Sequence, residues 1–365
     1  SGAVNGPYFG CQEVSAIRVG SSAGNQVGTL HASNLTVSNF QKTGIIASGP
    51  GSNVNIQNSN IIGVGNQPTI AQNGVQISGG ATGSVTGSNI RGLACGNPGC
   101  SFSNYYSYGI LLYGSGTIEG NTFETSDAAV YVWSPGGSST IDGNTVNTTR
   151  DSGIYLDEGT HTVTNNMINE DGSQPMIGIG VFAFPGAVGN TSATIRGNSI
   201  IGTFATQPPS PPNLPTAGIW INDFDTSDSF EPNATVSFNR IVNNAEAGVR
   251  NDSVTSVNAE NNWWGCNAGP GGSGCDTVAG TGATNYSTWL TLTGITASST
   301  TLNYNAPSTI SGVTLCYNSM PANVCTVNDH IPDGLAVAYS ANPGTAGSIS
   351  PTSGSFTTGN AANTT

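Results

Sequence analysis

The chain has 365 residues, of which 7% are charged, and its 7 basic against 20 acidic residues give a formal net charge of −13 at pH 7. Binding to nucleic acid or to an anionic membrane surface needs clustered Lys and Arg, so this composition argues against either partner. It also argues against an enzyme for acidic polysaccharides, whose uronate carboxylates need basic groups to hold them. No stretch approaches the ~20 apolar residues of a membrane-spanning helix, so we expect no membrane insertion.

Residues 1–27 precede the first repeat and contain one isolated cysteine, Cys11. An uncovered first coil of a repeat protein exposes strand edges, so we expect this N-terminal leader to cap the coils that follow. The pattern of a signal peptide is absent, and we interpret the chain as a mature protein or an excised fragment.

One motif recurs between residue 28 and about residue 265. It consists of an apolar residue, two variable residues, Asn or Ser, one further residue and a second apolar residue. Its copies are Leu30–Ser33–Leu35, Ile56–Ser59–Ile61, Val85–Ser88–Ile90, Ile118–Asn121–Phe123, Ile141–Asn144–Val146, Val163–Asn166–Ile168, Ile195–Asn198–Ile200, Val236–Asn239–Ile241 and Ala259–Asn262–Trp264. A small residue followed by apolar–x–apolar comes after each of the first seven copies, as in GIYL at residue 153; GVRN at residue 248, after the eighth copy, begins the same way but has Asn251 at the second apolar place.

Each repeat predicts two short strands joined by a turn. Alternation along the second strand turns Ile154 and Leu156 inward and Tyr155 outward. Neither strand buries its apolar edge alone, so the repeats must stack on one another. The sequence therefore predicts an all-β fold whose main part is a right-handed parallel β-helix over residues 28–280. The LxxLxL pattern of a leucine-rich horseshoe is absent, and a propeller needs longer repeats.

The Asn of the repeat is predicted to be structural. When Asn side chains stack at the same turn of successive coils, each NH₂ group donates to the amide oxygen of the next coil, which satisfies amides that are costly to bury unpaired. The predicted ladder consists of Asn121, Asn144, Asn166, Asn198, Asn239 and Asn262. The first three coils have Ser at this place in the motif.

Six of the seven cysteines fall into close pairs around short loops that contain Gly, Asn or Pro. This spacing predicts three local disulfides, Cys95–Cys100, Cys266–Cys275 and Cys316–Cys325, and therefore an oxidising compartment outside the cell or at its surface. Zinc binding is the alternative, but no C-x₂-C motif and no His at ligand spacing accompany the pairs. Cys11 is left without a predicted partner in the chain.

The segment ENNWWGCNAGPGGSGCDTV, residues 260–278, follows the last coil. Two tryptophans and a Gly-rich disulfide loop can close the end of a β-helix, which otherwise exposes its core. This segment closely resembles the ending of many bacterial right-handed β-helix repeat proteins that are secreted or lie on the cell surface. The resemblance covers roughly residues 28–290, is specific in Trp-Trp-Gly-Cys, and implies an extracellular or cell-surface protein.

Residues 281–290 are interpreted as a linker, and residues 291–365 begin a new pattern of alternating strands. The stretch IPDGLAVAYSANPGTAGSISPTSGSFTTGNAANTT, residues 331–365, is similar to bacterial immunoglobulin-like (Ig-like) domains of the invasin and intimin type. The resemblance implies a small β-sandwich, and members of that family continue with one or two strands beyond the point that corresponds to Thr365. We therefore expect an incomplete sandwich. Either the chain is truncated, or a strand of another copy completes the sandwich in a head-to-tail polymer.

Aromatic residues gather at the outward positions of the second strand of the repeats. Sugars stack on aromatic faces, so this surface is a candidate binding site for a neutral glycan. The candidate residues are Tyr113, Tyr131, Trp133, Tyr155, Phe182 and Trp220. Inserted loops at about 91–107, 169–176 and 202–216 all enter this strand. They are predicted to form one wall of a groove; the alternative is that they fold over the aromatic side chains and bury them.

Carboxylates on the same surface permit a second hypothesis. A glycoside hydrolase needs two carboxyl groups that flank the scissile bond. If the chain is an enzyme, Asp157 is the outward candidate, and Asp223 or Asp225 lies two coils away, ~10 Å along the axis. The motifs of polygalacturonase-like β-helix enzymes are absent, so no catalytic residue is assigned.

The acidic segment after residue 222 also has a spacing that hard cations tolerate. Asp223, Asp225 and Asp228 are calcium candidates, although the Gly and the terminal Glu of an EF-hand loop are absent. No other cofactor is expected. The three histidines, His31, His161 and His330, stand alone in the sequence and are expected to be surface or turn residues.

Two classes of function follow. The first is an extracellular structural or adhesive surface protein, a rigid rod or fibre subunit that polymerises through strand donation to the Ig-like module. The second is a secreted carbohydrate-active enzyme, either a hydrolase or an epimerase, or a glycan-binding protein that uses the outward aromatic and acidic face. The expected partners are therefore other copies of the chain or a surface glycan.

Overall fold

The structure is a computed structural model. It describes residues 15–65, 70–94, 106–169, 177–202 and 215–294; beyond these it describes 296–297, 310–311, 314–321, 325, 327, 329–338 and 353–356. Every regular element in these residues is a β-strand. The described part of the chain contains no helix of the length and hydrophobicity that crossing a membrane requires.

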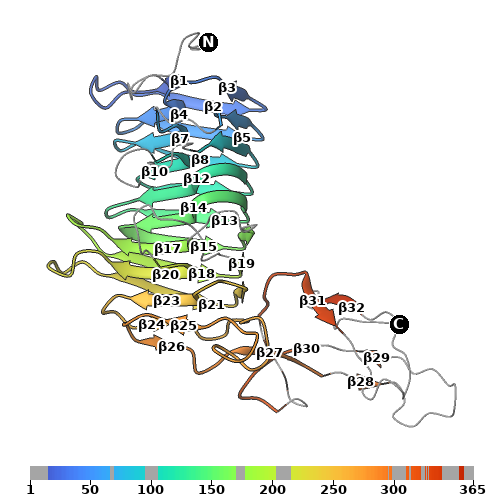
Figure 1. The fold of residues 1–365 in the computed structure, drawn as a ribbon. Helices are drawn as coiled ribbons and strands as arrows, with labels where there is room; N and C mark the ends of the chain where they lie inside the picture. The colour runs from blue at the N-terminus through green and yellow to red at the C-terminus, as the bar shows by residue number, and fades with distance from the viewer. Residues whose placement is uncertain are drawn as a thin grey trace.

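The chain winds into a stack of parallel coils, with the first coil and the last at opposite ends (Figure 1). One sheet runs the length of this stack, and its strands pair in parallel with the strands of the coils above and below. Its strands are β1 (Ser15–Val19), β4 (Thr43–Ser48), β7 (Asn73–Ser78), β10 (Tyr108–Tyr113), β12 (Thr122–Trp133), β14 (Thr145–Asp157), β17 (Ile177–Ala183), β20 (Ala217–Asp223), β23 (Ala247–Asp252) and β25 (Val278–Ala279). The predicted parallel β-helix is confirmed.

A second sheet forms another side of the stack, again with every neighbouring pair parallel. Its strands are β2 (Thr29–Ser33), β5 (Asn53–Gln57), β8 (Thr82–Thr86), β11 (Gly116–Glu119), β13 (Ser138–Asp142), β15 (Gly159–Thr164), β18 (Thr191–Arg196), β21 (Pro232–Ser237), β24 (Val257–Asn258) and β26 (Thr284–Asn285). No register shift interrupts the pairing from β8 to β21.

Short strands form a third side. They are β3 (Thr36–Ser38), β6 (Asn60–Ile62), β9 (Asn89–Leu93), β16 (Met167–Asn169), β19 (Ser199–Ile201) and β22 (Arg240–Val242). In the two middle coils this side is continuous with the first sheet, because β12 and β14 are long strands that bend around the corner. Their pairing shows register shifts between Phe123 and Ala128, where the strands bulge.

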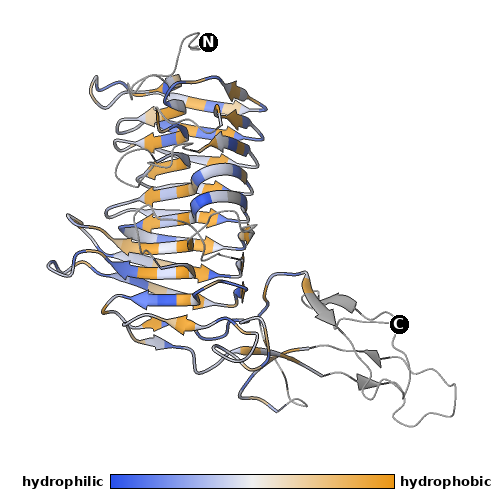
Figure 2. Cartoon of the chain, in the orientation of Figure 1, coloured by the Kyte–Doolittle hydropathy of each residue, from blue (hydrophilic) through white to orange (hydrophobic). Residues whose placement is uncertain are grey.

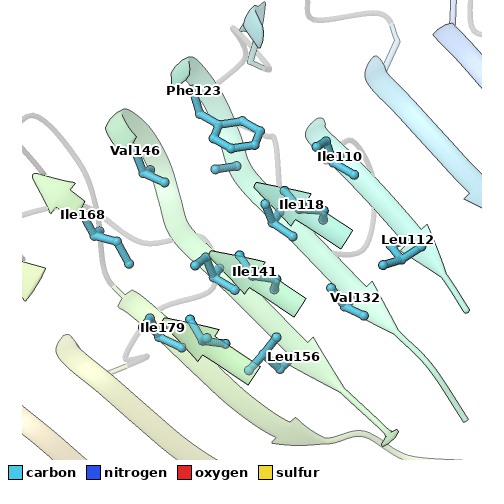
Figure 3. Close-up of a cluster of buried hydrophobic side chains, with 14 of the residues drawn as sticks. Ile110, Leu112, Ile118, Phe123, Val132, Ile141, Val146, Leu156, Ile168 and Ile179 are labelled. Carbon is cyan, nitrogen blue, oxygen red and sulfur yellow. The ribbon is translucent and has the colours of Figure 1, made fainter. Parts of the chain in front are cut away.

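A single cluster of buried apolar side chains fills the interior from Val19 to Trp264. The inward residues of all three sides meet there, and Figure 3 shows Val132 of β12 and Leu156 of β14 in the same interior as Ile141 of β13. Figure 2 shows the apolar residues recurring along the stacked strands. Burying one such side chain contributes about 1.5–3 kcal/mol relative to exposure, so a core of this length accounts for the stacking.

The six ladder asparagines lie directly above one another at the turn between the second and third sides. Each Asn donates a side-chain N–H to the Oδ1 of the next, from Asn121 to Asn262, at 2.9–3.0 Å. The second N–H of Asn144 donates to the carbonyl of Ile118, and its Oδ1 also accepts the backbone N–H of Asn121. Both donors and both acceptor positions of this buried amide are therefore occupied.

Before Asn121, Ser59 and Ser88 occupy the place of the ladder asparagine at this turn. Ser59 Oγ accepts the backbone N–H of Leu35 at 3.1 Å, and Ser88 Oγ accepts that of Ser59 at 3.1 Å. In the first coil the place of Ser59 is therefore taken by Leu35. The sequence alignment of that coil on Ser33 was wrong by two residues, since Ala32 pairs with Ile56.

The tryptophan segment, predicted to close the β-helix, is followed by one further short pair of strands. Trp264 is fully buried in the main core, and the disulfide Cys266–Cys275 is formed in the loop that follows. The coils continue past this loop, because β25 pairs with β23 and β26 pairs with β24. Residues 281–290, expected as a linker, thus carry β26 and the fully buried Leu290.

Beyond residue 290 the described strands pair antiparallel in twos. They are β27 (Leu290–Thr293) with β30 (Thr314–Tyr317), β28 (Thr296–Ala297) with β29 (Ile310–Ser311), and β31 (Leu335–Ala338) with β32 (Ser353–Phe356). The disulfide Cys316–Cys325 is formed in this region. Cys11 and the predicted pair Cys95–Cys100 lie outside the described residues.

This C-terminal part packs against the end of the β-helix. Phe238 and Trp263 share a second buried cluster with Leu290, Leu315 and Ile331. Polar contacts accompany the packing, because Arg196 of β18 forms an ion pair with Asp329, and its guanidinium lies 4.5 Å from the centre of the Phe238 ring. The junction is therefore a packed interface.

Candidate ligand-binding face

The outer surface of the first sheet between β10 and β20, called the aromatic face below, holds all six glycan-binding candidates. Strand register places four residues in one column, which runs in the order Tyr131, Tyr155, Gly180 and Trp220. A neighbouring column contains Tyr113, Trp133, Asp157 and Phe182. The outward alternation predicted from the sequence therefore brings these residues together on one face.

Half of these aromatic side chains are buried on that face. Tyr155, Phe182 and Trp220 are 1–3% exposed and form a small apolar cluster of their own with Tyr106. The rings of Phe182 and Trp220 lie 5.2 Å apart, edge to face. Gly180 makes room for this packing, since a Cβ there would lie 2.3 Å from Phe182 Cε2. These three rings contribute packing energy and do not present free faces to a ligand.

The remaining candidates are accessible. Trp133 is 37% exposed, and Tyr113 and Tyr131 are half-buried. The ring of Tyr113 meets that of Trp133 edge to face at 5.4 Å. Central parts of the three inserted loops, residues 95–105, 170–176 and 203–214, lie outside the described residues. The predicted groove wall, and the alternative that the loops cover the aromatic side chains, therefore concern residues outside the described part of the chain.

Buried carboxylates support the aromatic face from below. Asp151 accepts hydrogen bonds from the hydroxyls of Tyr106 and Tyr155, the latter at 2.8 Å, and burial raises the pKa of its carboxyl. Asp127, also fully buried, forms an ion pair with Arg150 at 2.9 Å. Both acids are occupied by protein partners, which gives them a structural role.

Asp157 differs from these two. It is 5% exposed, its Oδ2 accepts the hydroxyl of Tyr131 at 3.1 Å, and its Oδ1 has no hydrogen-bond partner among the described residues. Burial raises the pKa of Asp157 to about 7, and the nearby Glu158 adds to the rise. Near neutral pH this carboxyl is therefore divided between its protonated and ionised forms, so it can donate or accept a proton or a hydrogen bond.

Glu158 fixes the exposed tryptophan. Its Oε1 accepts the indole N–H of Trp133 at 2.6 Å, and its Oε2 accepts the backbone N–H of Val188 at 2.9 Å. The Glu158 side chain is itself buried. The indole ring is thereby held in one orientation before any ligand arrives, which lowers the entropic cost of stacking on it.

The three calcium candidates lie at the end of β20 and in the loop after it. Each uses one carboxylate oxygen to accept a backbone N–H of the same loop: Asp223 from Asp225 at 2.8 Å, Asp225 from Ser227 at 3.0 Å, and Asp228 from Phe230 at 2.8 Å. This is the geometry of Asx turns, which shape loops without a metal. Within the described ranges no group of three or more His, Cys, Asp or Glu side chains is placed to hold a metal ion.

His161 contradicts the expectation of a surface residue. It is fully buried, with Nε2 donating to the carbonyl of Glu158 at 2.8 Å and Nδ1 accepting the hydroxyl of Ser139 at 2.9 Å. Burial lowers its pKa to about 4, so the ring is neutral at pH 7. It occupies an inward position of β15 two residues before Val163. Its hydrogen bond holds the backbone carbonyl of Glu158, the residue after Asp157. His31 and His330 are exposed.

The fold and this face define an all-β solenoid of parallel coils with one aromatic and acidic side. The family described as "Right handed beta helix region" matches residues 16–271, more than half of the chain. The chain belongs to this family. No curated protein and no solved structure matches it. Because the family is defined by its coils, membership establishes the fold, and the function depends on the residues at the surface.

Proposed function

We propose that this chain is an extracellular structural or adhesive surface protein in which the β-helix serves as a rigid rod. The observation that carries the proposal is the continuity of the stack: one apolar core spans the coils, and an unbroken ladder of six buried amides ties successive coils together. Every coil is held to the next along its full width, so bending at one point requires breaking several buried contacts.

The packed junction with the C-terminal part supports the same role. We interpret residues 291–365 as an Ig-like module, and the cluster around Trp263 and Leu290 holds its first strands against the rod. A module fixed in this way keeps a constant distance from the far end of the rod. The two disulfides fit an oxidising compartment.

The test of this role combines location with shape. Protease treatment of intact cells of the native host should release the chain, and small-angle scattering of the purified protein should give one elongated particle of constant length. A chain confined to the cytoplasm with reduced cysteines would contradict the proposal. Light scattering over a concentration series tests the head-to-tail polymer predicted from the sequence.

A second function, glycan binding at the aromatic face, is favoured by one specific observation. Trp133 is exposed and fixed by Glu158, and it lies beside the half-ionised Asp157, so a stacking surface and a hydrogen-bonding group are adjacent. Trp133→Ala should weaken retention on an insoluble neutral polysaccharide at least fivefold. Tyr286→Ala, which removes a similarly exposed aromatic ring elsewhere, is the matched control.

The enzymatic version uses Asp157 as the acid. Its pKa of about 7 suits a general acid at neutral pH. Asn222, two strands away, is in register with Asp157, and Asp223 is the next residue of β20. By strand spacing Asp223 lies roughly 10 Å along the axis from Asp157, near the upper limit for an inverting pair. A screen for released reducing sugar with Asp157→Asn as the control tests this version, and no turnover on any neutral glycan would contradict it.

A further inference from the structure

The outer surface of the second sheet, called the hydroxyl face below, has a regularity that the proposed rod function does not require. Its central outward column contains threonine in five successive coils. In order from β11 to β21 these are Thr117, Thr140, Thr162, Thr194 and Thr235, each paired in register with the next. The last four are exposed and Thr117 is half-buried.

A parallel column lies two residues earlier in the same strands. It consists of Ser138, Thr160, Ser192 and Asn233, all exposed and again in register. Strand geometry places the side chains of one column about 4.8 Å apart along the rod axis and the two columns about 6.7 Å apart across it. The two columns therefore form a rectangular grid of hydroxyl and amide groups.

The five threonine hydroxyls have no hydrogen-bond partner in the described part of the protein. At the N-terminal end the situation differs, because Ser84 Oγ donates to Asn55 and the amide of Asn55 contacts His31. Threonine is also branched at Cβ, so in a strand its hydroxyl and methyl group are held in few orientations. The grid is thus free to contact a ligand and is rigid before it does so.

The amide ladder explains why the spacing stays constant. The corner between this sheet and the third side has two residues in each coil from β11 to β21, such as Gly143–Asn144, and the Asn of each corner is bonded to the next. The three long insertions enter the first sheet instead and leave this sheet uninterrupted. Coil spacing on the hydroxyl face is therefore set by hydrogen bonds of nearly equal length.

The chemistry of the grid restricts the ligand. Neither column contains a charged or aromatic side chain; the charged residues of these strands, Glu119, Asp142 and Arg196, lie in a third outward column at the edge of the sheet. A soluble sugar gains little from isolated hydroxyl contacts that water makes equally well, and a charged polymer finds no opposite charge. Many weak contacts give a useful binding free energy only when they form at the same time, which requires a partner with a matching repeat. The partner must also be rigid, because neither side then loses conformational freedom on binding.

We propose that the hydroxyl face binds ice. Ice is a neutral, rigid lattice of hydrogen-bond donors and acceptors, and its oxygen atoms repeat at spacings of this size in both directions. The threonine hydroxyls join that lattice, and the methyl groups beside them fill the spaces between lattice waters. Binding extends over several coils, so disturbing the middle of the grid disrupts contacts on both sides.

The experiment grows ice slowly from a dilute solution of the purified full chain mixed with an unrelated globular protein. The wild-type chain should be enriched in the ice relative to the second protein and should produce faceted crystals. Thr162→Tyr, in the centre of the column, should lower this enrichment at least fivefold. The matched control Thr36→Tyr places the same ring on an exposed strand threonine of the third side and should behave as wild type.

Exclusion of the wild-type chain from ice together with the second protein would overturn the proposal, as would equal enrichment of wild type and Thr162→Tyr. Retention on crystalline cellulose or chitin combined with exclusion from ice would overturn it in favour of a crystalline glycan. Thermal melting identifies a variant that fails to fold. Thr194→Tyr then replaces Thr162→Tyr with the same expected loss.

Discussion

The aromatic face and the hydroxyl face are built by the same coils, yet they differ in regularity. The aromatic face contains strands that bulge, receives the long insertions and packs large rings over buried acids. The hydroxyl face has strands in unbroken register, and small side chains fill the two columns of its grid. Both rest on one core, so the difference comes from the corners. The corner after the second sheet has a constant length and is held by the amide ladder, so the hydroxyl face stays periodic. The corners that lead into the first sheet vary in length, so the side chains and loops of the aromatic face differ from coil to coil.

The largest effect is expected from breaking the ladder. Asn166→Ala leaves the side-chain and backbone N–H groups of Asn144 without their buried acceptor. This should lower the free energy of unfolding by about 3–5 kcal/mol. Denaturant unfolding measures the loss. Asn233→Ala, at an exposed asparagine of β21, should change stability by less than about 0.5 kcal/mol, and equal losses in the two variants would contradict the role of the ladder.

Effects of comparable size are expected from two buried titratable groups, of which His161 lies inside the periodic sheet. Its pKa is about 4 in the folded chain and about 6.5 when unfolded, so the unfolded chain binds the proton more readily. The stability is therefore complete above pH 6.5 and falls by up to about 3 kcal/mol as the pH drops to 4. His161→Gln should flatten this part of the pH profile, while His31→Gln should leave it unchanged.

On the aromatic face the sign is opposite. The pKa of Asp157 rises from 3.8 to about 7 on folding, so its contribution to stability is complete below pH 3.8 and is lost as the pH rises through 7. Asp157→Asn should thus be about 4 kcal/mol more stable than the wild type at pH 8, and close to it at pH 4. A less stable variant at pH 8 would show that the ionised carboxylate stabilises the fold.

The smallest effect is expected at the hydroxyl grid. Thr162→Val retains the branched shape and removes a hydroxyl that has no protein partner. The free energy of unfolding should therefore change by no more than about 0.5 kcal/mol, which thermal melting measures. A larger loss would mean that the column of threonines serves stability. A negligible loss of stability would indicate that the threonine column serves recognition at the surface.

The coils could be predicted from sequence because each makes the same local choice. Asn121, Asn144 and Asn166 stand three residues after an inward apolar residue, and this spacing alone determines where they stack. The inward position of His161 was also readable, since it alternates with Val163, but its isolation from other histidines suggested a surface residue. The threonine column follows from the same rule, because Thr140 and Thr162 each come just before an inward residue and therefore point outward.

The burial of Tyr155 could not be predicted in this way. Alternation gives its direction, outward from the sheet, but Phe182 and Trp220, which pack beside it, come from coils 27 and 65 residues later in the chain. The raised pKa of Asp157 has the same origin, because it depends on how neighbouring coils cover the carboxyl. Local pattern determines the direction of a side chain, whereas tertiary packing determines its exposure.

The most direct test of the account is hydrogen exchange of the asparagine side-chain NH₂ groups, followed by NMR. If the ladder ties the coils together, the side-chain amides of Asn144, Asn166 and Asn198 exchange only on global unfolding, while those of the exposed Asn233 and Asn285 exchange at once. Exchange of the ladder amides as fast as that of Asn233 would contradict the account.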